Sequence, residues 1–102
     1  MHLIQILLPL SDQAGEHFPR EEYARVEQLL VERFGGYTAY ARAPASGLWT
    51  NDKSAVERDD LVIYEVMTKK LEKTWWGEFR KTAEQRFRQT EVVIRSLVIE
   101  IL

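Results

Sequence analysis

FGGYTAYARAPASGLWTNDKSAVERDDLVIYEVM, residues 34–67, is the stretch that decides the fold of this chain. It reads as the end of a helix, a strand, a loop and a second strand. Residues 37–42 form the first of these strands, and Pro44 directly after them places it at a sheet edge, because proline donates no ladder hydrogen bond. Residues 60–68, DLVIYEVMT, carry β-branched and aromatic side chains at both alternations. This pattern predicts a central strand, joined to the edge strand as a hairpin.

The residues before the hairpin predict a strand and a helix. Residues 2–8 are a short apolar run interrupted by Gln5, which is typical of a strand covered on both faces. Pro19 occupies the position that proline prefers at the start of a helix, and Gly35 follows where a helix is capped. The apolar residues between them recur at helical spacing, at Tyr23, Val26, Leu30 and Phe34.

The residues after the hairpin predict a helix followed by a strand, the opposite order to that before the hairpin. Residues 70–89 predict a second helix, and residues 92–101 predict a last strand that runs to the C-terminus. Gly77 weakens the helix relative to alanine, so we expect close packing at this position. The apolar face of the helix consists of Trp76, Phe79, Ala83 and Phe87.

The element order is therefore β-α-β-β-α-β, which predicts an α+β, ferredoxin-like fold. In this fold a four-stranded antiparallel sheet has the order 4-1-3-2, with both helices on one face. The apolar first and third strands take the central places, and the strand before Pro44 takes an edge. A chain of 102 residues fits one such domain, residues 1–102.

Composition limits the functional classes. The chain has no cysteine, which removes disulfides and thiolate chemistry and is compatible with the cytoplasm, where we expect the protein. A formal net charge of −2 gives no electrostatic case for nucleic acid or for an anionic membrane, and no apolar run is long enough for a membrane helix. His2 and His17 lack partners at metal-ligand spacing, so we predict neither a metal nor a cofactor.

The face of the sheet away from the helices is predicted to be apolar. Neither alternation of the central strands gives a polar face, and soluble proteins avoid a large exposed apolar patch. We therefore expect a homodimer in which two sheets pack face to face. Gln5, Glu65 and Arg95 are polar exceptions in mid-strand, and register permitting they form one row. Glu65 and Arg95 orient a small ligand between the sheets, form a structural ion pair, or remain two solvated side chains at a rim.

Aromatic residues extend this candidate site. Trp49 and Trp75 are expected to line a cleft and to stack on an aromatic ligand, or in the simpler case to make a loop or dimer contact. Asp59 and Asp60 are expected to form a polar strand start, with a divalent-cation site as the alternative. The complete set of predicted ligand-binding residues is Gln5, Tyr40, Arg42, Trp49, Tyr64, Glu65, Trp75 and Arg95.

The hairpin GGYTAYARAPASGLW, residues 35–49, with RDD at 58–60 and VIYEVM at 62–67, resembles a set of small bacterial proteins. They are similar to the dimeric ferredoxin-like, or dimeric α/β-barrel, superfamily, and the likeness implies its fold and its dimer. That superfamily includes haem proteins, which need an axial histidine that His2 and His17 are poorly placed to supply. It also includes cofactor-independent monooxygenases that bind aromatic substrates.

Three functions remain open at this stage. The first is a homodimer that binds a small aromatic or acidic molecule between its sheet faces. The second is a cofactor-independent enzyme of the monooxygenase type. The third is a structural or protein-interaction module. A cavity beside Gln5, Glu65 and Arg95 would favour the first two, and a completely filled sheet face would favour the third.

Overall fold

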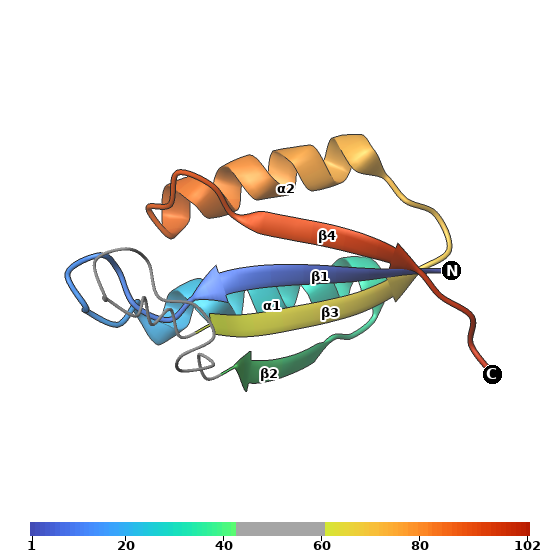
Figure 1. The fold of residues 1–102 in the computed structure, drawn as a ribbon, viewed down its shortest axis with the longest axis horizontal. Helices are drawn as coiled ribbons and strands as arrows, with labels where there is room; N and C mark the ends of the chain where they lie inside the picture. The colour runs from blue at the N-terminus through green and yellow to red at the C-terminus, as the bar shows by residue number, and fades with distance from the viewer. Residues whose placement is uncertain (43–60) are drawn as a thin grey trace, which may run out of the picture.

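The computed structural model describes residues 1–42 and 61–102, and these residues form the predicted sequence of elements (Figure 1). In chain order the elements are β1 (His2–Pro9), α1 (Arg20–Phe34), β2 (Thr38–Arg42), β3 (Leu61–Thr68), α2 (Lys73–Arg86) and β4 (Val93–Val98). The α+β fold of βαββαβ type is confirmed.

The four strands form one antiparallel sheet in the order β2-β3-β1-β4 (Figure 1). This is the predicted order 4-1-3-2 read from the other edge. The prediction for the last strand was too long, because β4 ends at Val98 and not at residue 101. The Ile99 N–H still donates to the Met1 carbonyl at 2.9 Å, one residue beyond the end of β4.

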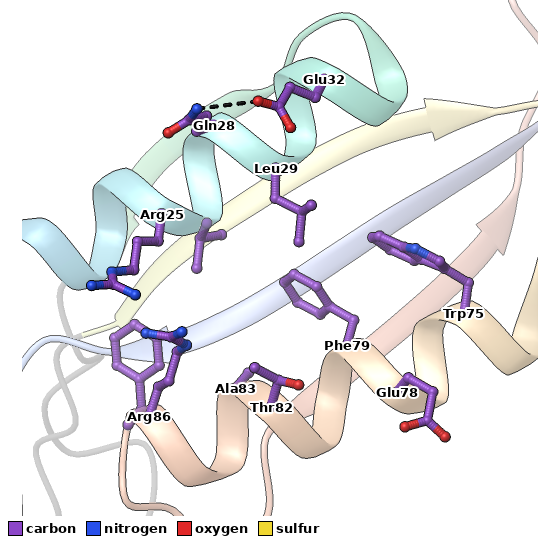
Figure 2. A pocket seen from close by; sticks show the side chains of 12 residues that line it. Arg25, Gln28, Leu29, Glu32, Trp75, Glu78, Phe79, Thr82, Ala83 and Arg86 are labelled. Carbon is purple, nitrogen blue, oxygen red and sulfur yellow. Dashed lines mark hydrogen bonds between the residues drawn. The ribbon is translucent and has the colours of Figure 1, made fainter.

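The two helices run in opposite directions along the same side of the sheet, and a groove of about 450 Å³ lies between them (Figure 2). Gly35 ends α1 as predicted: its φ of 83° is left-handed, and its N–H donates to the Val31 carbonyl at 2.9 Å. The expected close packing at Gly77 is wrong, because a Cβ built there would meet nothing within 4 Å.

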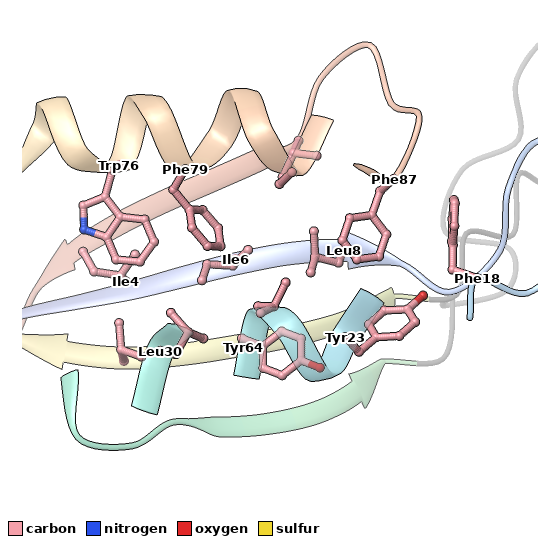
Figure 3. Close-up of a cluster of buried hydrophobic side chains, with 14 residues drawn as sticks. Ile4, Ile6, Leu8, Phe18, Tyr23, Leu30, Tyr64, Trp76, Phe79 and Phe87 are labelled. Atoms are coloured by element: carbon pink, nitrogen blue, oxygen red, sulfur yellow. The ribbon is translucent and has the colours of Figure 1, made fainter. Parts of the chain in front are cut away.

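The core lies between the helices and one face of the sheet (Figure 3). Ile4, Ile6 and Leu8 of β1 point into it, and their exposed fractions are 1% or less. Both helices and β3 pack against them, as do Phe18 and Val92 beside the elements. Trp76, Phe79, Ala83 and Phe87 are all buried, so the predicted apolar face of α2 is confirmed. The helix layer thus covers one alternation of the central strands β1 and β3 and leaves the other uncovered by helices.

Candidate functional site

The face of the sheet away from the helices, called the open face below, carries three rows of side chains. The strand register sets these rows. In the first row Met67 and Leu97 flank Leu3, and in the third row Ile63 and Val93 flank Leu7. The middle row places Glu65 and Arg95 on either side of Gln5. A polar row therefore lies between two apolar rows.

The middle row is joined by hydrogen bonds, and Tyr40 reaches it diagonally from its register position beside Ile63. We call the chain of Tyr40, Glu65, Gln5 and Arg95 the polar strip. Arg95 Nε donates to Gln5 Oε1 at 2.7 Å, and Gln5 Nε2 donates to Glu65 Oε2 at 2.7 Å. The Tyr40 hydroxyl donates to the same Glu65 oxygen at 3.0 Å. Tyr40 lies on β2, so the strip crosses all four strands of the sheet.

Glu65 and Arg95 do not form an ion pair, so the ion-pair interpretation of the row is wrong in detail. The register puts β1 between their strands, and Gln5 bridges them by accepting from Arg95 and donating to Glu65. Arg95 uses only its Nε atom. Its two terminal amino groups make no hydrogen bond to the residues that the structure describes, and the side chain is exposed. Four N–H donors of Arg95 are therefore left without a partner among the described residues.

The apolar rows beside the polar strip are far more exposed than the core. Met67, Leu97 and Val93 have exposed fractions of 55%, 47% and 44%. Ile63 is the exception at 2%, and it lies on the open face between Leu7 and Tyr40 in register. Contiguous apolar surface of this kind, divided by a polar row, is typical of an interaction surface.

Two of the predicted ligand-binding residues lie on the opposite side of the sheet. Tyr64 points into the core with an exposed fraction of 2%, and Trp75 lies on α2 beside the inter-helix groove. Neither can join Glu65 in one site within a protomer. The backbone of Arg42 pairs with Leu61 at the end of β2. Trp49 falls outside the described residues, as do Asp59 and Asp60.

Tyr64 instead belongs to a polar cluster that no sequence pattern predicted. Its hydroxyl donates to Glu27 Oε2 at 2.7 Å, and Arg20 donates to both oxygens of Glu27 at 3.1 and 3.3 Å. The one available signal is that Glu27 follows Val26 at the border of the apolar face of α1. There a carboxylate lies close enough to the core to meet a buried hydroxyl.

This cluster shifts the pKa values of its members. Burial alone would raise the pKa of Glu27, but the hydrogen bonds from Arg20 and Tyr64 outweigh it and hold that pKa below the usual value. Burial, followed by the bond to the Glu27 carboxylate, raises the pKa of Tyr64. Burial raises the pKa of Tyr23 to about 12, and its hydroxyl donates to the Pro9 carbonyl at 2.6 Å. The cluster is a satisfied link between α1 and β3, with no group poised for proton transfer.

The described part of the chain offers no metal site and no membrane helix. Across residues 1–42 and 61–102, no three side chains of the types that bind metals gather in one place. None of the helices in these two ranges is long and apolar enough to cross a membrane. Comparison of the chain with known protein families, with curated proteins and with solved structures finds no match.

Proposed function

We propose that this protein is a small-molecule-binding homodimer whose two copies pack through their open faces. The observation that carries the proposal is the polar strip lying between two exposed apolar rows. Packing two such faces removes the apolar rows from water and brings the two strips together. The likeness of the hairpin to proteins of the dimeric α/β-barrel superfamily supports the same assembly.

Charge on the strip selects one arrangement of the two copies. A twofold axis that runs along β1, midway between the sheets, carries β4 of one copy over β3 of the other. Arg95 of each copy then faces Glu65 of the other, and apolar rows meet apolar rows. A twofold axis that runs across the strands instead places Arg95 over Arg95, which like charges oppose. Charge complementarity therefore favours the axis along β1.

The test is a charge swap on the strip, read by sedimentation equilibrium. We expect the wild-type chain to sediment at twice its mass of 12.0 kDa at micromolar concentration. Arg95→Glu places carboxylates against carboxylates and should weaken the dimer by about tenfold or more. The double variant Glu65→Arg with Arg95→Glu restores opposite charges across the axis, and Gln5 can rotate its amide to serve the exchanged partners.

The outcomes separate the alternatives. Recovery of the dimer in the double variant supports the axis along β1. A wild-type monomer, or a dimer that Arg95→Glu leaves unchanged, overturns dimerisation through the open face. Circular dichroism of each variant checks that the sheet is intact.

The ligand part of the proposal rests on the unused donors of Arg95. A small acidic molecule enclosed between the sheets would accept hydrogen bonds from its two terminal amino groups, in competition with Glu65 of the other copy, and would lie beside Gln5. Native mass spectrometry of the purified dimer should then show a bound acid that Arg95→Gln removes. If the dimer carries no bound molecule and Arg95→Gln changes only the association constant, the polar strip stabilises the dimer and does not bind a ligand.

We do not extend the proposal to catalysis. The monooxygenase alternative needs a base directed at a substrate, and Glu65 Oε2 already accepts two hydrogen bonds from its own protomer.

A further inference from the structure

The groove between α1 and α2 is concave and mostly apolar, which distinguishes it from the flat open face. Its floor consists of buried core residues of both helices, among them Val26, Phe79 and Phe87. Leu29 forms part of the α1 wall and has an exposed fraction of 39%. A volume of about 450 Å³ lies within the range of sites for small molecules and is too small for a partner helix.

One end of the groove is closed by contacts between the helices. Phe34 of α1 meets Trp75 of α2 edge-on, with ring centroids 5.6 Å apart. The Arg33 guanidinium lies 4.4 Å from the centroid of the Trp75 ring and donates to Glu72 Oε2 at 2.6 Å. This end is therefore apolar within and sealed by an ion pair at the surface.

The other end is cationic. Arg25 of α1 and Arg86 of α2 point toward one another across the gap (Figure 2). Arg86 Nη1 donates to Glu22 Oε1 at 3.2 Å, which leaves most of its donors unused. Arg25 makes no hydrogen bond or ion pair within the described part of the chain. Two guanidinium groups with spare donors at the mouth of an apolar groove match one carboxylate.

The remaining charges fix the direction of such a ligand. Glu32 lies on the wall nearer the closed end, where it accepts from Gln28 at 3.1 Å, and the Glu78 carboxylate points away from the gap (Figure 2). Glu22 also lies at the mouth, but it is paired with Arg86, so the two arginines keep an excess of positive charge there that orients a carboxylate toward them. The lined part of α2, from Trp75 to Arg86, is about 16 Å long at 1.5 Å per residue.

The aromatic wall favours an aliphatic chain over a ring. Trp75 is stacked against Phe79 with centroids 5.5 Å apart and also lies under Arg33. Trp75 meets Trp76 edge-on at 4.8 Å as well. Its ring surface is thus largely taken by protein groups. The expectation that Trp75 stacks on an aromatic ligand therefore loses its basis, whereas a flexible chain can follow the remaining surface.

We infer that the inter-helix groove binds an aliphatic monocarboxylate of medium chain length, with its carboxylate at Arg25 and Arg86 and its chain along Leu29 and Phe79. This site is separate from the open face and does not depend on the dimer.

The test is titration of the full chain with decanoate, followed by backbone amide NMR and calorimetry. We expect saturable binding with shifts concentrated at groove residues such as Leu29 and Thr82. Arg25→Gln should weaken binding about tenfold, because it removes a charge-assisted pair of hydrogen bonds. Leu29→Glu, at an exposed position, should weaken binding by a similar factor by placing a carboxylate in the path of the chain.

Matched controls keep the inference falsifiable. Arg80→Gln removes an arginine of α2 that lies outside the groove, and it should leave decanoate affinity unchanged. Decan-1-ol has the same chain without the charge and should bind at least tenfold more weakly. Equal binding of the alcohol, an unchanged affinity in Arg25→Gln, or shifts confined to the open face would each overturn the site. Groove shifts that follow protein concentration instead of decanoate would assign the groove to a second copy.

Discussion

The two faces of the sheet differ in how far other elements cover them, although both faces carry large apolar side chains. On the helix side, Ile4, Ile6 and Leu8 are sealed under α1 and α2. On the open side, Leu3 and Leu7 alternate with them along the same strand and stay partly exposed. Side chains alternate along a strand, so neighbouring residues of β1 point to opposite faces. One of them lies in the core, and the next lies on a surface that another molecule can cover. The difference teaches that position in the fold, and not hydrophobicity, assigns each residue its role.

The largest expected effect comes from truncating neighbours that point to opposite faces. Leu8→Ala should cost about 2–5 kcal/mol of unfolding free energy, because it opens a cavity in a sealed core. Leu7→Ala should leave the protomer almost as stable and instead weaken association. Urea unfolding at two protein concentrations separates the two effects. Equal losses for both variants at every concentration would mean that the open face is part of a second fixed core.

A smaller effect is expected when one hydroxyl is removed from each face. Tyr64→Phe removes the donor to Glu27 from a buried position and should cost about 1.5 kcal/mol. Tyr40→Phe removes the donor to Glu65, but Tyr40 is 43% exposed and Glu65 keeps Gln5, so the cost should stay within about 0.5 kcal/mol. Chemical denaturation of the two variants measures the difference. A larger loss for Tyr40→Phe would place the more rigid network on the open face.

Acid should weaken the helix side through Glu27. Its pKa is depressed in the folded protein, so its stabilisation is present above the ordinary value of 4.5 and is lost as pH falls through the lower folded value. Hydrogen bonds from the Glu16 and Ala14 amides, with Arg88 nearby, lower the pKa of Asp12, which acts in the same direction. Unfolding free energies measured from pH 6 to pH 3 should fall less steeply in Glu27→Gln than in the wild type. Parallel curves would assign the acid sensitivity to other carboxylates.

The last expected change is a modest gain in stability. Gly77 lies within α2, and a Cβ at this position meets open space, so Gly77→Ala should stabilise the protein by about 0.5–1 kcal/mol. Thermal unfolding of the variant measures the gain. A loss would show that the layer between α2 and β4 closes more tightly around this glycine than its surroundings indicate.

Much of the polar strip could be predicted from the sequence, because the signal lies within the residues of each strand. Gln5, Glu65 and Arg95 are each isolated polar residues in mid-strand, and the predicted sheet order makes their strands neighbours. An antiparallel register then brings mid-strand positions together. The bridging role of Gln5 was not predictable, because it depends on which strand lies between the two charges and on side-chain geometry.

Other residues of the predicted site were misplaced for a different reason. Tyr64 and Glu65 are adjacent in sequence, so they point to opposite faces, and only one of them can join a given row. Trp75 adjoins the apolar face of α2, yet its neighbours are decided by how the two helices pack across the sheet. Arg25 and Arg86 likewise lie far apart in the chain, and no periodic sequence pattern predicts that they meet.

The sequence by itself determined the order of elements, the sheet order and the presence of polar residues amid an apolar face. These features were predictable because hydrophobic periodicity, proline and glycine each affect the backbone within a few residues of their position. The tertiary structure alone decided which alternation of each strand the helices cover, because both alternations of β1 are apolar and either could have been buried. It also decided that a groove remains between the helices, since that depends on side chains of α1 and α2 meeting at one end and remaining apart along the rest.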